Sequence, residues 1–240
     1  MKTAAIVLAA GRGKRMEADV AKQYLLLSGK PVLFYALEAF QNSEVDEIVL
    51  VTGQDEISYC KKEIVERFGF DKVTHIVAGG KERYHSVHQG LEALDECDYV
   101  LIHDGARPFV TPEIIRRTIL CAMQKEACIA GMPSKDTVKL SDENGFVKET
   151  PNRSTVWTVQ TPQTFSFPLI RNAYRVLMER EVELKHKGVQ ITDDAMVVEY
   201  LSGKKVKLVE GSYENIKITT PEDLDVAEAF LSKRKNVKNQ

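Results

Sequence analysis

A short apolar segment, residues 4–10, runs directly into a glycine-containing loop that carries three cations. The loop spans residues 11–15 and reads GRGKR, and Lys22 follows close behind. Glycines let the backbone approach an anion closely and direct N–H groups toward it, while the basic side chains supply positive charge. In an open α/β sheet, ligands bind outside the carboxyl ends of the strands, which is where this loop falls. The pattern predicts a buried strand that ends in a phosphate-binding loop, with an exposed basic turn as the alternative.

Two well-known phosphate loops do not match this segment. A dinucleotide-binding loop has a third glycine three residues after the second, and that position is Met16. A P-loop has a glycine five residues before its Gly-Lys pair and a Ser or Thr after the lysine, and these positions hold Leu8 and Arg15. The missing third glycine argues against a hydride-transferring dehydrogenase. The loop is better suited to a nucleoside triphosphate held in another way.

Along the rest of the chain, apolar strand-like segments alternate with amphipathic helical ones. Such alternation is typical of βαβ units and predicts an α/β fold with a mostly parallel twisted sheet and helices on both faces. The expected strands are 48–51, 73–77, 99–102, 129–132, 206–210 and 215–218, and the expected helices are 31–40, 57–68, 86–94, 112–124, 168–183, 193–201 and one after Pro221.

The alternation is interrupted at residues 135–155. Two short alternating segments, 137–140 and 146–148, flank an Asn144-Gly145 pair, which is a signal for a β-hairpin. A hairpin with so few apolar residues is not stable alone in water. We therefore expect an arm that leans on another surface such as a second subunit, with an ordinary surface excursion as the alternative. The whole chain, 1–240, is expected to form a single domain that carries this arm.

Composition limits the possible partners and the compartment. The 240 residues carry a formal net charge of −2 with 28% charged residues, which argues against a general nucleic-acid or membrane-surface binder. The four cysteines show no paired C-x-x-C spacing and are expected to be reduced thiols. No segment approaches the ~18 apolar residues that a membrane span needs. A cytoplasmic protein is expected.

Polar or small residues follow several of the predicted strands, and they could lie together at one edge of the sheet. Asp104 could hold a ribose hydroxyl or a magnesium ion, and Arg107 could bind a second phosphate. Lys217 lies between Ile216 and Ile218 in a predicted strand, so it should point away from the core. The five groups are 11–22, 79–86, 103–108, the set Arg153, Thr158, Thr161, Pro162 and Gln163, and residues 192–194 with Lys217.

These segments resemble those of the 2-C-methyl-D-erythritol 4-phosphate cytidylyltransferase family of the non-mevalonate isoprenoid pathway. The match covers most of the chain, in the family's order. The matching segments are LAAGRGKRM (8–16), KQY (22–24), GGKERYHSV (79–87), HDGARPF (103–109), DTVK (136–139), NRS (152–154), QTPQTF (160–165), TDDA (192–195) and NIKITTPEDL (215–224). The resemblance implies a Rossmann-like nucleotidyltransferase sheet, CTP with Mg²⁺ or another divalent cation, and a homodimer joined through the 135–155 arm.

The resemblance also implies roles for single residues. Besides its nucleotide-binding role, Asp104 would be a weak metal contact, directly or through water. Lys81 stands where relatives often have Asp. The implied catalytic residues are Arg15, Lys22 and Lys217; the nucleotide-binding residues are Ala9, Ala10, Gly11, Gly13, Gly80, Lys81, Ser86 and Asp104; the residues binding methylerythritol phosphate are Arg107, Thr161 and Thr192, with Thr137 and Arg153 from the partner's arm.

Two other functions stay open at this point. A cytidylyltransferase of the same build acts on ribitol 5-phosphate, but its relatives usually carry Ser-Val where this chain has Gly105-Ala106. A non-catalytic nucleotide sensor could keep the phosphate loop, but the presence of both Lys22 and Lys217 argues against it.

His85 and His88 lie one helical turn apart, but no cysteine or carboxylate at matching spacing completes a metal site.

Overall fold

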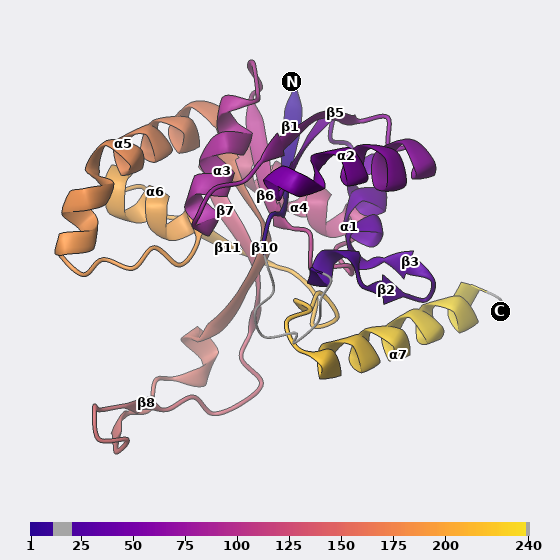
Figure 1. Ribbon diagram of the computed structural model, residues 1–240. Helices are drawn as coiled ribbons and strands as arrows, with labels where there is room; N and C mark the ends of the chain where they lie inside the picture. Colours follow the sequence, from indigo (N-terminus) through magenta and orange to yellow (C-terminus); the bar gives the residue numbers. More distant parts are fainter. Residues whose placement is uncertain (12–20, 239–240) are drawn as a thin grey trace.

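The computed structural model describes residues 1–11 and 21–238, with side chains up to Arg234. Within these residues, seven strands form one sheet in the order β11-β7-β10-β6-β1-β4-β5 (Figure 1). Neighbouring strands are parallel except where β10 pairs with β6 and β7. The predicted mostly parallel sheet is confirmed. The strands are β1 (Thr3–Ala9), β4 (Glu47–Thr52), β5 (Val73–Ala78), β6 (Tyr99–Asp104), β7 (Ala127–Pro133), β10 (Trp157–Ser166) and β11 (Lys207–Glu210).

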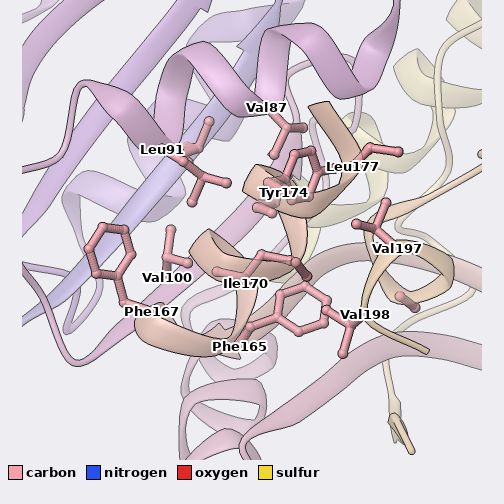
Figure 2. Packing of buried hydrophobic residues seen from close by; sticks show 14 of the residues in the cluster. Val87, Leu91, Val100, Phe165, Phe167, Ile170, Tyr174, Leu177, Val197 and Val198 are labelled. Atoms are coloured by element: carbon pink, nitrogen blue, oxygen red, sulfur yellow. The ribbon is translucent and has the colours of Figure 1, made fainter. Parts of the chain in front are cut away.

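Helices cover both faces of the sheet, because successive side chains of each buried strand point to opposite faces. Ala4 and Ile6 of β1 pack in one core beneath α3, α5 and α6, part of which Figure 2 shows. Ala5 and Val7 pack in the other, beneath α1, α4 and a π-helical segment. The helices are α1 (Val32–Gln41), α2 (Ile57–Tyr59), the π-helix Cys60–Glu66, α3 (Arg83–Glu92), α4 (Pro112–Lys125), α5 (Phe167–His186), α6 (Asp194–Ser202) and α7 (Pro221–Lys238).

A third, smaller core lies where α7 packs against the short hairpin of β2 (Leu26–Leu27) and β3 (Lys30–Pro31). Ile218 is fully buried in this core, and its N–H donates to the Ala106 carbonyl at 2.8 Å. The packing therefore fixes the segment that carries Lys217 beside the end of β6.

The predicted hairpin is present at the end of a long arm that extends away from the sheet and helices (Figure 1). It pairs β8 (Leu140–Ser141) with β9 (Val147–Glu149) in antiparallel fashion. Gly145 has a φ of 83°, a conformation that glycine adopts without strain. Large apolar side chains of the arm lie in solvent within this chain, since Phe146 is 72% and Val147 is 62% exposed.

Two expectations about the elements were wrong. Residues 158–163, expected among the segments that follow a strand, form part of β10, and Gln163 is buried although it is polar. Residues 215–218 form a loop and not a strand, so the strand-alternation argument for the direction of Lys217 does not apply. Lys217 nevertheless reaches the ligand side of the sheet, because the loop is anchored through buried Ile218.

Candidate active site

A cavity of about 800 Å³ lies at the carboxyl ends of β1, β4, β5 and β6. Each of these strands contributes the residues that directly follow it or end it, as the doubly wound topology requires. The contributions are Ala9, Ala10 and Gly11 from β1; Gly53 and Gln54 from β4; Gly79, Gly80, Lys81, Glu82, Arg83 and Ser86 from β5 and the start of α3; Asp104 and Ala106 from β6; and Lys22, Gln23 and Lys217 from other segments.

One wall of the cavity is made largely of backbone. A Cβ atom on Gly79 would overlap the Ala10 side chain, so only glycine fits between β1 and α3 at this point. The Ser86 hydroxyl accepts a hydrogen bond from the Gly80 N–H at 3.1 Å and lies 3.4 Å from the Glu82 carbonyl. Ser86 therefore ties the loop after β5 to the first turn of α3.

Lys22 and Lys217 also line the cavity. Lys22 opens a 3₁₀ turn (Lys22–Tyr24), and the next residue, Gln23, is buried and donates to the Ala9 carbonyl at 2.5 Å. Tyr24 completes the attachment, since its hydroxyl lies 2.7 Å from Oγ1 of Thr52 at the end of β4. These contacts hold Lys22 against the ends of two neighbouring strands, where it lines the cavity.

Asp104 ends β6 and is surrounded by cations. Its Oδ1 lies 3.2 Å from Nε of Arg83, its Oδ2 lies 2.7 Å from Nζ of Lys217, and Nε of Arg107 is 3.9 Å away. Burial alone would raise the pKa of this carboxyl, but the three cations outweigh it and hold the pKa well below its usual range. Asp104 is therefore ionised at neutral pH and positions Lys217 at the cavity wall.

Arg83 joins this carboxylate to a second one that the sequence alone did not pair with it. Its Nη1 and Nη2 bind both oxygens of Asp194 at 2.9 and 2.8 Å, and the Tyr174 hydroxyl donates to the same carboxylate at 2.5 Å. Asp194 is fully buried at the start of α6. Burial would lower the pKa of Arg83, but Asp194 and Asp104 raise it well above its usual value. The pair fixes α3 to α6 beneath the cavity.

Several implied site residues do not line this cavity. Thr161 is buried, and its hydroxyl accepts from the Asp104 N–H at 3.1 Å, so it supports Asp104 from behind. Arg107 donates to the Asn215 carbonyl at 2.8 Å and thereby holds the loop of Lys217. Thr192 is exposed beside Met196. The exposed arm residues Thr137 and Arg153 are also absent from the lining described for one chain, while Gly13 and Arg15 lie outside the described residues.

His103 is buried behind Asp104, between Thr161 and the Arg107 backbone. Its Nδ1 lies 2.9 Å from the Thr161 hydroxyl and its Nε2 is 3.2 Å from the Arg107 carbonyl. The Arg107 carbonyl can only accept, so the ring donates from Nε2, and the hydroxyl uses its own hydrogen to donate to Nδ1. These bonds suit a neutral imidazole, and burial lowers the pKa of His103 to about 4.

The free energy of unfolding should consequently fall by about 2 kcal/mol between pH 7 and pH 5. The unfolded chain, whose histidine pKa is about 6.5, binds more protons than the folded chain in this range, so stability rises with pH. Urea titrations at pH 7, 6 and 5 would measure the slope. His103→Gln should flatten it, whereas His186→Gln, at an exposed position, should not. A slope that His103→Gln leaves unchanged would contradict the assignment.

A cavity lined by glycines and lysines, at the carboxyl ends of the parallel strands, is typical of a nucleotide-binding α/β protein. The chain belongs to the 2-C-methyl-D-erythritol 4-phosphate cytidylyltransferase family, whose model matches residues 3–233. It is 54% identical over 230 residues to the protein of that name from Lachnoclostridium phytofermentans, with 96% of each chain covered. The Alkaliphilus oremlandii relative is 48% identical over 236 residues, which cover 98% of this chain and 97% of the relative.

Solved structures agree with this membership. The crystal structure of 4-diphosphocytidyl-2C-methyl-D-erythritol synthase from Anaerococcus prevotii superposes with a TM-score of 0.83 at 37% identity, covering 96% of both chains. That of the cytidylyltransferase from Francisella tularensis gives 0.75 at 30% identity, covering 95% of this chain and 98% of that one. The resemblance seen in the motifs is confirmed, and the chain is a nucleotidyltransferase. Among the described residues, no helix is long and apolar enough to cross a bilayer.

Proposed function

We propose that this chain transfers CMP from CTP to 2-C-methyl-D-erythritol 4-phosphate and releases pyrophosphate. The observation that carries the proposal is the cavity of about 800 Å³ whose walls combine the backbone of Gly79 and Gly80 with Lys22 and Lys217. A wall of backbone groups suits a flat base, and lysines suit phosphates. The names of the curated relatives, at up to 54% identity over nearly the full length, support both substrates. These substrates are intracellular metabolites, so we place the activity in the cytoplasm.

The two ends of CTP fall on different walls in this proposal. The cytosine lies against Ala9, Ala10 and the segment 80–81, with the Ser86 hydroxyl beside it, and Asp104 faces the ribose. The triphosphate lies against Gly11, Lys22 and Lys217, which line the same cavity. Gly13 and Arg15 of the basic loop complete the triphosphate contacts, although they lie outside the described residues.

The chemistry needs no general base. An oxygen of the methylerythritol phosphate, already anionic at pH 7, attacks the α-phosphorus of CTP. The bond from that phosphorus to the oxygen bridging to the β-phosphate breaks, and its electron pair leaves with pyrophosphate. The difficulty is electrostatic, because two polyanions must meet and negative charge must move to the leaving group. Fixed cations therefore do the catalysis, and we assign this role to Arg15, Lys22 and Lys217.

A divalent cation fits this site only as a partner of the nucleotide. Among the described residues, no three His, Cys, Asp or Glu side chains converge as metal ligands. Both oxygens of Asp104 already face cations, Arg83 and Lys217. Magnesium commonly keeps several waters and binds substrate phosphates with one or two carboxylates. Asp104 would contact it, directly or through water, and the ion would neutralise phosphate charge.

The acceptor is proposed to bind where two subunits meet. Arg107 and Thr192 belong to the subunit that holds CTP, where buried Thr161 supports Asp104 from behind, and Thr137 and Arg153 come from the partner's arm. The exposed apolar side chains of the arm support this arrangement, because a solvated arm would gain from burying them. The chain is then a single domain, 1–240, with the 135–155 arm as its dimerisation element.

A Phe146→Asp substitution should weaken the dimer at least ~10-fold, because it removes the burial of an aromatic side chain and places a charge in the interface. Phe146 is 72% exposed in one chain. Sedimentation velocity across a dilution series would measure the effect. Val182→Asp is the matched control, since Val182 is 70% exposed on α5, outside the arm. Equal dissociation of the two variants, or an unchanged dimer in Phe146→Asp, would contradict the assignment.

Pyrophosphate release from CTP and magnesium tests the function directly, with methylerythritol 4-phosphate and ribitol 5-phosphate offered separately. Release with the first acceptor alone is the expected result. Release with the second alone would assign the chain to the ribitol-phosphate enzymes. Binding of CTP without release with either acceptor would indicate a nucleotide sensor.

A further inference from the structure

An acidic residue outside the cavity holds the first turn of α3. Glu181 of α5 accepts a hydrogen bond from the Tyr84 hydroxyl at 2.9 Å, and its carboxylate lies 3.1 Å from Nε2 of His85. Lys185, one turn further along α5, contacts the same carboxylate at 2.6 Å. The two helices pack together in the first core (Figures 1 and 2). Glu181 thus joins α5 to the end of α3 that lies nearest the cavity.

His85 also bonds to the backbone at the start of α3. Its Nδ1 accepts from the Glu82 N–H at 3.2 Å. A neutral imidazole that accepts at Nδ1 carries its proton on Nε2, so the ring donates to Glu181. Glu82 is the N-cap of α3 and His85 the third residue of the helix, so this bond is the half of a capping box that runs from the third side chain back to the N-cap backbone. The ring therefore links Glu181 to the Glu82 backbone by two hydrogen bonds in series.

The backbone that His85 holds is part of the cavity wall. Gly80, Lys81 and Glu82 line the cavity, whereas His85 and Glu181 are not among the described residues that do so. A Cβ on Gly80 would overlap Cβ of His85, so the loop lies directly on this residue. Cβ of His85 thus supports Gly80, and the His85 ring holds the end of the 80–82 loop through its bond to the Glu82 N–H.

We propose that His85 and Glu181 are positioning residues that fix the 80–82 loop for the base of the nucleotide. The inference rests on the proposed function, in which this loop contacts cytosine. A glycine-containing loop loses much conformational entropy when it is ordered, so a loop already held in place binds its ligand at lower cost. Neither residue belongs to the described lining of the cavity, which Lys22 and Lys217 share. The pair therefore sets the affinity for CTP and not the rate of the chemical step.

His85→Ala and Glu181→Ala test the proposal. Each should raise KM for CTP about 5- to 10-fold, the scale of one neutral hydrogen bond, and leave kcat within about twofold. Calorimetric titration with CTP, without acceptor, should show the same factor in Kd. The preference for CTP over UTP should fall, because a displaced loop reads the base less well. A purely structural role would lower stability without this split between KM and kcat.

Two further variants make the test sharp. His85→Asn can place its amide oxygen near the position of Nδ1, so it should recover much of the affinity that His85→Ala loses. Glu183→Ala is the matched control on the same helix. Hydrogen bonds to basic neighbours lower the pKa of Glu183 to about 2, as they do for Glu181. The neighbours of Glu183, however, are Arg180 and Lys187, which belong to the Glu183 side of α5 and not to α3. Glu183→Ala should leave KM and Kd for CTP unchanged.

The outcomes separate the two proposals. If the unchanged chain releases no pyrophosphate with methylerythritol 4-phosphate, the proposed function fails. If the unchanged chain does release pyrophosphate, but His85→Ala and Glu181→Ala bind CTP as tightly as the parent and Glu183→Ala, the positioning role is overturned. A loss of kcat with an unchanged KM would also overturn it.

Discussion

Replacing Lys217 by alanine should lower kcat for CTP and methylerythritol phosphate by at least ~100-fold, the scale of losing one preorganised donor. Its Nζ lies at the cavity wall, 2.7 Å from Asp104, in a loop held by Arg107 and by buried Ile218. A cation fixed in this way needs no reorganisation when negative charge moves to the leaving pyrophosphate. Single-turnover pyrophosphate release at saturating substrates would measure the chemical step.

The result has to be separated from a change in the fold, because Asp104 loses a partner in this variant. Lys217→Arg keeps the charge and should retain part of the activity that alanine removes. Lys207→Ala, at an exposed position of β11, should leave kcat unchanged. Lys22→Ala should behave like Lys217→Ala. Near-normal turnover in both the Lys22 and the Lys217 variant would refute the assignment of these lysines.

The sheet could be predicted from the sequence where its strands are uniformly apolar. β1 and β6 are buried on both faces, so their sequences contain apolar runs that need no alternation to be recognised. β10 was missed because Pro162 and Gln163 interrupt its pattern, and proline usually excludes a central strand. Gln163 is tolerated there because its side-chain oxygen accepts from two backbone N–H groups at the start of α6.

Only part of the candidate site could likewise be predicted from the sequence. Residues at or just after the end of a strand, such as Asp104 and Gly80, could be predicted because parallel strands bring their carboxyl ends to one edge. Arg83 and Asp194 lie within two of the recognised motifs, but their pairing spans 111 positions of the chain, and no local pattern indicates it. The Glu181–His85 contact lies between two helices and was invisible for the same reason.

Asp194→Ala should lower the free energy of unfolding by about 3–5 kcal/mol, the scale of breaking a buried ion pair by removing one partner. Asp194 is fully buried and accepts from both Nη atoms of Arg83 and from the Tyr174 hydroxyl. Its removal strands the hydroxyl of Tyr174 in the core and leaves Arg83 with Asp104 alone. Urea unfolding at pH 7 would measure the loss.

The controls distinguish a lost pair from a lost side chain. Glu179→Ala breaks an exposed pair with Arg175, 2.8 Å long, and should leave the urea midpoint unchanged, because solvent already screens that pair. Arg83→Met should itself destabilise, since it leaves the buried Asp194 carboxyl without its bidentate partner. Combining Arg83→Met with Asp194→Leu should cost clearly less than the sum of the single losses, because the double variant buries no unpaired charge. Additive losses would mean that the two side chains stabilise the fold independently, and the buried pair would not be what fixes α3 to α6.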